Sequence, residues 1–207
     1  YQQLEELKGI LNQPTFGNCA MQMGAELEMY LVDNSGQVSL TNQLLLEKLN
    51  DSQFQPELNQ YNLELNLSPV LQQGKPFSKM REELRNKTGY LEKVALQNNI
   101  NVVPVGILPT LRMEHLNCQH MTPLNRYKVL ADKLYKERGE AFKVNINGEE
   151  PVSVNFNDIS AEGANTSFQV HLMVNKNQFV SVFNAAQLTM PLVTAISANS
   201  GIFLGHR

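Results

Sequence analysis

Three stretches of the chain alternate apolar and polar residues with a period of two. The stretches are residues 22–32, 61–69 and 167–174, with the sequences QMGAELEMYLV, YNLELNLSP and SFQVHLMV. In the second stretch we expect Tyr61 to share an apolar face with Leu63, Leu65 and Leu67. Such alternation is typical of β-strands that bury one face and present polar residues on the other. The pattern therefore predicts three strands, each with one face against a core.

Other segments show the spacing of amphipathic helices or a hairpin signal. Helices are predicted over residues 41–49, 76–98, 123–138 and 176–198, and a hairpin over residues 143–156 around Asn147 and Gly148. Thr41 is the expected N-cap of the first helix, Pro123 stands at the first turn of the third, and Pro191 should disturb the last. The apolar row of the last helix, with Phe179 and Phe183, is expected to lie in the core. With no repeat and no low-complexity linker, we expect a single α+β domain over residues 1–207 with a mostly antiparallel sheet.

Composition excludes several classes of function. The net charge is −3, so no broad basic surface indicates nucleic-acid binding. No apolar run approaches the roughly 20 residues that a membrane helix needs, so no membrane segment is expected. The two cysteines, Cys19 and Cys118, are too few for a disulfide scaffold and fit a reducing compartment. We therefore expect a cytoplasmic protein.

The polar faces of the three predicted strands carry candidate chemistry. If the strands share a sheet, one side gathers Glu26, Glu28, Glu64 and His171, with Gln169 beside the histidine. Carboxylates two residues apart on a strand lie about 7 Å apart and repel one another unless water or a cation separates them. Oxygen-rich sites with an occasional histidine suit Mg²⁺ or Mn²⁺, whereas the two cysteines do not have zinc-site spacing. A solvated polar sheet face explains the same alternation, and the pattern leaves both interpretations open.

Six segments in order resemble those of glutamate–cysteine ligases and the related carboxylate–amine ligases. They are GAELEMYLVD, NLELNLSP, GILPTLRMEHL, MTPLNRYKVLADKLYKERGEAF, ANTSFQVHLMV and AISANSGIFLGHR. The chain departs from the family pattern at two points. Gly201 stands where the family usually has proline, and Glu64 is one residue further from Pro69 than in that pattern.

The resemblance implies both a fold and a reaction. The fold is a curved, mostly antiparallel sheet with long helices on its outer face, similar to the catalytic sheet of glutamine synthetase. Family enzymes use ATP to phosphorylate the γ-carboxylate of glutamate, and the amine of cysteine or of another acceptor then displaces phosphate. The resemblance makes Glu26, Glu28, Glu64 and His171 the expected ligands of Mg²⁺ or Mn²⁺.

The resemblance also points to residues that would contact substrate. These are Gln169 on the third strand, Arg126 and Tyr127 in an RY motif, and Arg207. For each of them, an ordinary surface or polar-face role is the alternative.

Family enzymes continue beyond the last of these segments. We therefore expect residues 1–207 to be a piece of a longer protein, incomplete at the C-terminus, inactive alone and self-associating through an exposed sheet edge. Two other functions remain open. One is a fragment or degenerate relative that binds a cation or glutamate without turnover, and the other is a ligase with a different acceptor amine.

Overall fold

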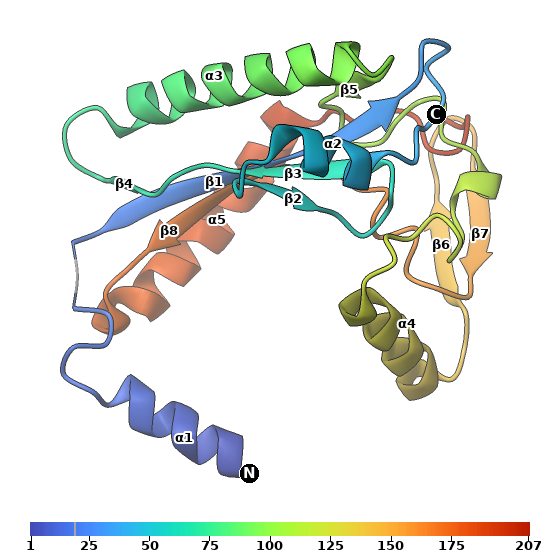
Figure 1. Ribbon diagram of the computed structural model, residues 1–207. Helices are drawn as coiled ribbons and strands as arrows, with labels where there is room; N and C mark the ends of the chain where they lie inside the picture. Colours follow the sequence, from blue (N-terminus) through green and yellow to red (C-terminus); the bar gives the residue numbers. More distant parts are fainter. Residues whose placement is uncertain (19) are drawn as a thin grey trace.

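The computed structural model describes residues 1–18 and 20–207, and Cys19, one of the two cysteines, lies outside them (Figure 1). The helices are α1 (Gln2–Leu11), α2 (Asn42–Leu49), α3 (Pro76–Leu96), α4 (Asn125–Arg138) and α5 (Phe179–Ser197), with 3₁₀ turns at Met113–His115 and Lys176–Gln178. The strands are β1 (Gln22–Val32), β2 (Phe54–Pro56), β3 (Asn62–Asn66), β4 (Val70–Leu71), β5 (Asn101–Val103), β6 (Phe142–Ile146), β7 (Val152–Phe156) and β8 (Phe168–Met173). The chain is thus an α+β protein, as predicted.

Strand β1 is the centre of an open sheet. It pairs antiparallel with β3 and β4 along one edge and with β8 and β5 along the other, while β2 extends the sheet beyond β3. The pairing places Glu28 opposite Glu64, and Glu26 opposite both Asn66 and Gln169. The prediction that the three alternating stretches share one mostly antiparallel sheet is confirmed.

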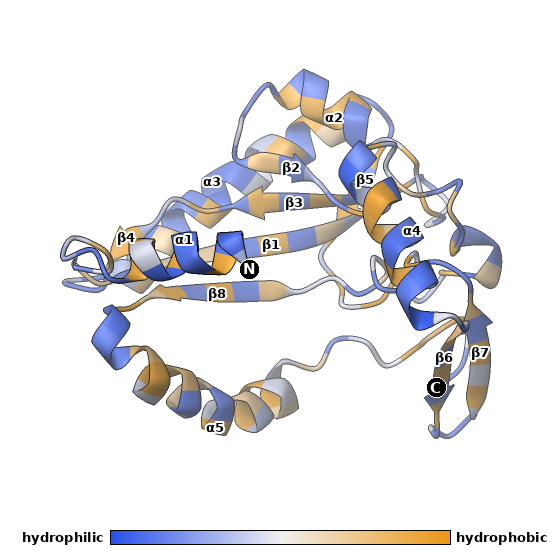
Figure 2. Cartoon of the chain, turned by 90° about the horizontal axis from the view of Figure 1, so that it is seen from below, coloured by the Kyte–Doolittle hydropathy of each residue, from blue (hydrophilic) through white to orange (hydrophobic). Residues whose placement is uncertain are grey.

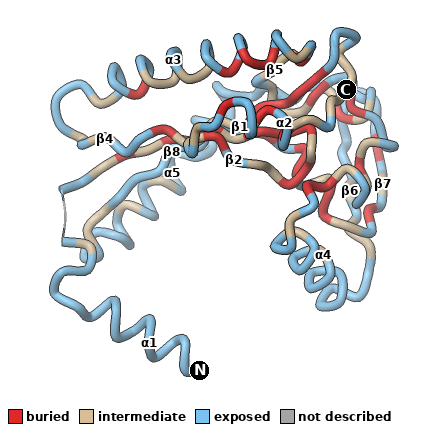
Figure 3. The backbone as a smooth tube through the Cα atoms, in the orientation of Figure 1, coloured by how far each residue is buried: buried red, intermediate tan, exposed pale blue. Residues whose placement is uncertain are grey.

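Helices α2 and α3 cover the apolar face of this sheet (Figures 1 and 3). The core that they form contains Ala25, Met29, Leu31, Leu45, Leu49, Leu63, Leu65, Met80, Leu91 and Val94. The alternation in β1 and β3 directs these apolar side chains toward the helices, so the polar residues of both strands must face the other way. Thr41 does precede α2, but its side chain makes no capping hydrogen bond.

A second core lies where β1 ends, and it corrects the expected position of Tyr61. Tyr61 does not share the face of the β3 leucines, because its ring stacks on that of Tyr30 with the centroids 5.8 Å apart. The reason is local: β3 begins only at Asn62, whose N–H donates to the carbonyl of Asn59 and closes a turn. The period of two therefore does not extend back to Tyr61.

No residue of helix α5 is buried, and only Val182 and Ala186 are partly covered, so the prediction that its apolar row lies in the core is wrong (Figure 3). Phe179 and Phe183 are both more than half exposed. The helix runs along β8 (Figure 2). A cavity of 450 Å³ between them is lined by Val170 of β8 and Val193 of α5.

The segment Lys176–Ser197 is also long and apolar enough to cross a membrane by length and composition. The expectation that no stretch of the chain reaches that length is therefore wrong. The helix has polar residues along it, among them Asn184 and Gln187. Because core helices of soluble proteins meet the same criterion, length and composition alone do not establish a membrane segment.

The remaining differences concern element ends. Strand β5 stops at Val103, because Pro104 has no N–H to donate to a neighbouring strand. Helix α4 begins at Asn125, two residues after the expected start at Pro123. The hairpin of β6 and β7 is confirmed, with residues 147–151 as its loop.

Candidate metal-binding site

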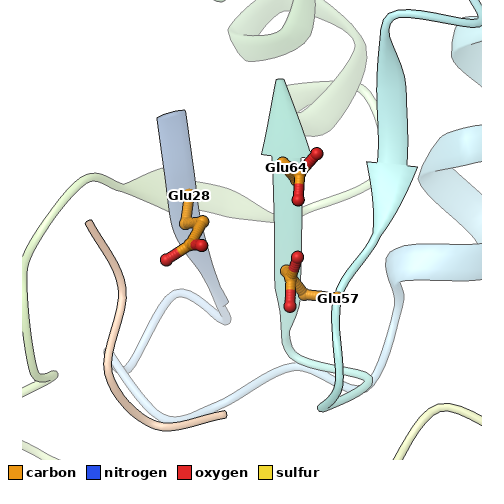
Figure 4. Close-up of side chains that lie close together, drawn as sticks. All are labelled: Glu28, Glu57 and Glu64. Atoms are coloured by element: carbon orange, nitrogen blue, oxygen red, sulfur yellow. The ribbon is translucent and has the colours of Figure 1, made fainter. Parts of the chain in front are cut away.

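Three glutamates meet on the polar face of the sheet. Glu28 of β1, Glu64 of β3 and Glu57, which follows β2, each place a carboxylate oxygen within 4.8 Å of the other two (Figure 4). The strand register explains the contact, because Glu28 and Glu64 are directly opposed and Gln55 opposes Glu64 from the other side. Two residues after Gln55, Glu57 comes back to the same face. We call Glu28, Glu57 and Glu64 the acidic cluster.

Strand β8 and the residue before it fix the carboxylate of Glu28. The backbone N–H and the hydroxyl of Ser167 donate to Glu28 Oε2 at 2.8 and 3.2 Å, and Gln169 Nε2 donates to Glu28 Oε1 at 2.8 Å. Burial nevertheless raises the pKa of Glu28, since it outweighs these hydrogen bonds, and the charge of Glu64 acts in the same direction. The hydrogen bonds therefore fix the orientation of the Glu28 carboxylate, but they balance only part of its negative charge.

Glu57 and Glu64 form the most crowded part of the acidic cluster. Burial, a hydrogen bond with Glu64 and the charges of Glu64 and Glu28 together raise the pKa of Glu57 to about 8. Without a cation, Glu57 thus keeps its proton near neutral pH and donates it in the hydrogen bond to Glu64. On the other side, Asn66 Nδ2 donates to Glu64 Oε1.

The acidic cluster fits a hard divalent cation. Mg²⁺ and Mn²⁺ prefer oxygen ligands, and three converging carboxylates offer only oxygens. A cation would also offset the burial and the carboxylate repulsion that raise the pKa of Glu57, because carboxylates this close do not all ionise without a counter-charge. Glu28, Glu57 and Glu64 are therefore the residues that could hold it.

Glu26 and His171 form a separate pair on the same face. Glu26 Oε1 lies 3.2 Å from His171 Nε2, and both side chains line a cavity of 210 Å³ beside the acidic cluster. The register accounts for the pair, because β8 places Gln169 opposite Glu26 and His171 opposite Gly24. The four predicted metal ligands are thus divided, with Glu28 and Glu64 in the acidic cluster and Glu26 with His171 about one strand repeat away.

Two of the predicted substrate-binding residues lie next to Glu57. Arg126 Nη2 donates to the hydroxyl of Tyr127 at 2.7 Å and to the carbonyl of Pro56 at 3.3 Å, and the Tyr127 hydroxyl donates to the same carbonyl at 3.0 Å. The guanidinium also stacks over the Tyr127 ring, 4.6 Å from its centroid. Burial and then the charge of Glu57 raise the pKa of Tyr127. The start of α4 therefore places the guanidinium of Arg126 and the hydroxyl of Tyr127 beside the acidic cluster.

Gln169 and Arg207 differ in their positions. Gln169 is part of the site through its bond to Glu28. Arg207 lies at the turn between β6 and β7, where its carbonyl accepts from the N–H of Glu150 at 2.9 Å. The contacts of Arg207 thus place it with the hairpin.

The sequence interpretation missed Glu57. The strand before it has only three residues and ends in Pro56, so no alternation of useful length marks the segment. Glu57 follows Gln55 by two residues and so lies on the same face of the strand. This spacing points to the site only once the pairing of Gln55 with Glu64 is known.

The sequence can also be compared with known proteins. The sequence model of glutamate-cysteine ligase family 2 matches residues 22–207, a range that contains the acidic cluster, the Glu26–His171 pair and the start of α4. No curated protein is significantly similar to the chain.

Proposed function

Because the chain belongs to glutamate-cysteine ligase family 2, we propose that it serves an ATP-dependent ligase that activates the γ-carboxylate of glutamate. In this reaction the carboxylate attacks the γ-phosphorus of ATP, ADP leaves, and an acyl phosphate forms. An amine, for which cysteine is our first candidate, then attacks the acyl carbon and releases phosphate. The cofactors are ATP and Mg²⁺ or Mn²⁺, and the proposed location is the cytoplasm.

The acidic cluster is the observation that supports this proposal most directly. Glu28, Glu57 and Glu64 would hold a divalent cation, and the Glu26–His171 pair offers a further carboxylate and imidazole beside them. Such a cation neutralises charge on the nucleotide phosphates and on the transferred phosphoryl group.

The residues around the acidic cluster have roles that follow from their contacts. Ser167 and Gln169 hold both oxygens of Glu28 and so fix the direction of its carboxylate. Arg126, exposed at the start of α4, is bonded to the carbonyl of Pro56, the residue before Glu57, and its guanidinium can pair with a carboxylate or phosphate. Positioning of this kind supplies much of the rate in phosphoryl transfer, because little covalent chemistry is left to the protein.

The test is ADP release and product analysis with the full-length protein. We expect glutamate-dependent ADP release in Mg²⁺, and a γ-glutamyl amide detected by mass spectrometry when cysteine or another member of an amine panel is present. Glu28→Gln and Glu64→Gln should each lower the rate at least a hundredfold. Glu47→Gln, at an exposed position on α2, is the matched control and should leave the rate unchanged.

Two results would contradict the proposal. One is the absence of glutamate-dependent ADP release with every amine tested. The other is full activity of the Glu28 variant, which would show that the acidic cluster does not serve the reaction. A product with an amine other than cysteine would support the ligase reaction and replace the proposed acceptor.

A further inference from the structure

The loop that joins β6 to β7 presents an asparagine followed by a glycine to the solvent. Residues 147–151 form this loop, and Asn147 and Gly148 are both exposed. The sequence has this dipeptide at no other position. Asparagine is thermally labile, because the backbone nitrogen of the next residue can attack its side-chain carbonyl carbon. Glycine in that next position hinders the attack least, since it has no Cβ.

No polar contact holds the two reacting groups in place. Among residues 1–18 and 20–207, the Asn147 side chain makes no hydrogen bond and the Gly148 N–H donates to no acceptor. The two groups belong to adjacent residues, so ψ and χ1 of Asn147 alone set the distance from the attacking nitrogen to the side-chain carbon. Rotation about these bonds can therefore bring the two atoms together without breaking a hydrogen bond.

Asn34, in the turn after β1, shows the opposite situation. It is exposed as well and is followed by another small residue, Ser35. However, the N–H of Ser35 donates to Asp33 Oδ1 at 2.8 Å, and Asn34 Oδ1 accepts from Asn101 Nδ2 at 3.2 Å. Both the attacking nitrogen and the carbonyl that it would attack are thus bound, so attack at Asn34 requires the turn to open first.

The fold itself requires glycine at position 148. The carbonyl of Arg207 occupies the space in which a Cβ on Gly148 would lie. Two hydrogen bonds hold Arg207 against the loop: its carbonyl accepts from the N–H of Glu150 at 2.9 Å, and its own N–H donates to Glu150 Oε2 at 3.3 Å. A side chain at position 148 would displace this contact. The contact therefore favours the residue that makes Asn147 reactive.

We propose that Asn147 is a site of spontaneous deamidation. The Gly148 nitrogen, after hydroxide has taken its proton, bonds to Cγ of Asn147, and the side-chain amide leaves as ammonia. Water then opens the cyclic imide at either of its carbonyls, which leaves aspartate or isoaspartate at position 147. The reaction consumes one amide and one water and yields one carboxylate and one ammonium ion. It requires no enzyme and is independent of the proposed ligase reaction.

The modification changes both the charge and the length of the loop. It adds a carboxylate beside Glu149 and Glu150, and isoaspartate also adds one methylene to the backbone. A longer backbone before Gly148 moves this residue relative to the Arg207 carbonyl. We therefore expect the hydrogen bond from the Glu150 N–H to Arg207 to weaken in the modified protein.

The test is peptide mapping by mass spectrometry of the protein kept at 37 °C and pH 8 over several weeks. We expect Asn147 to convert before every other asparagine, at a rate close to that of a synthetic peptide NINGEEP, and much more slowly at pH 5, where hydroxide is scarce. Asn34 should convert about tenfold more slowly in the folded protein than in its own peptide DNSGQ, because its turn must open first.

Two variants complete the test. Asn147→Gln should stop the conversion, because glutamine has to close a larger ring, whereas Asn34→Gln makes the same change in another exposed turn and should leave conversion at Asn147 unchanged. Hydrogen exchange at the Glu150 amide should be faster in the aged parent protein than in fresh protein, and the Asn147 variant should show no such change. The proposal is wrong if the folded protein keeps Asn147 intact while the peptide converts, or if Asn34 or Asn199 converts first.

Discussion

Replacing Glu57 with glutamine should stabilise the protein when no divalent cation is present. Glutamine keeps the shape of the protonated carboxyl, and its amide can still donate to Glu64, but it cannot acquire a charge. In the native protein burial, a hydrogen bond with Glu64 and the charges of Glu64 and Glu28 raise the pKa of Glu57 to about 8 from 4.5. The substitution therefore removes a group that resists ionisation in the folded state.

The pH dependence follows from which state binds more protons. Between pH 4.5 and about 8 the folded protein keeps the Glu57 proton while the unfolded chain has lost it, so unfolding releases a proton and stability falls as the pH rises through this window. Each pKa unit corresponds to about 1.4 kcal/mol. The difference would amount to about 5 kcal/mol if unscreened, and we expect about 2 kcal/mol because water reaches this partly exposed cluster. For a chain of this length that is a rise of about 4–8 °C in melting temperature.

The assay is thermal and urea unfolding of the parent protein and Glu57→Gln in EDTA at pH 4, 7 and 8.5. The two should be nearly equal at pH 4, and the glutamine variant should be the more stable at pH 8.5. Glu47→Gln, exposed on α2, controls for the general loss of one negative charge. A glutamine variant that loses stability between pH 4 and 8.5 as steeply as the parent would refute the reasoning, because the titrating group would then not be Glu57.

Further predictions concern neighbouring groups. The double substitution Glu26→Gln, Glu28→Gln should abolish Mn²⁺ binding in a calorimetric titration and leave the far-ultraviolet circular dichroism spectrum unchanged. Undiminished Mn²⁺ binding would exclude the polar sheet face as the cation site. In the full-length protein, His171→Ala should lower glutamate-dependent ADP release far more than it lowers the melting temperature, because the His171 side chain is half exposed; the reverse result would make it a structural residue. Tyr127→Phe removes a hydrogen bond to the carbonyl of Pro56 and should cost about 1 kcal/mol in urea unfolding, and an unchanged midpoint would show that the bond contributes nothing.

Much of the polar face could be predicted because it depends on one local rule. Glu28, Glu64 and Gln169 each lie on a strand with unbroken alternation, and the period of two fixes their side of the sheet once the strands pair. Which of them touch is a matter of register, and register depends on contacts far along the chain. The alternation alone therefore placed Glu26 in one ligand set with Glu28, whereas the register brings Glu26 next to His171.

The failures have equally local causes. Glu57 stands in a turn, where no periodicity applies, and Tyr61 is rotated by the turn that begins β3. Phe179 lies on a helix whose apolar residues have the spacing of a core helix. Such spacing shows that the helix has an apolar face, but it does not show whether another element packs against that face.

The central position of β1 has a consequence for the order of events during synthesis. One edge of β1 can pair early, because β3 follows it within about 40 residues. On the other edge β5 covers only Tyr30–Val32, and residues 22–27 wait for β8. The bond from Gln169 to Glu28 joins residues 141 positions apart. At 5–20 residues per second a ribosome needs roughly 7–28 s to make that stretch. During this interval the emerging chain carries an unpaired strand edge beside a row of carboxylates. Charged side chains next to an open edge discourage pairing with other chains, so the glutamates proposed to bind a cation in the finished protein would also protect the nascent one from aggregation.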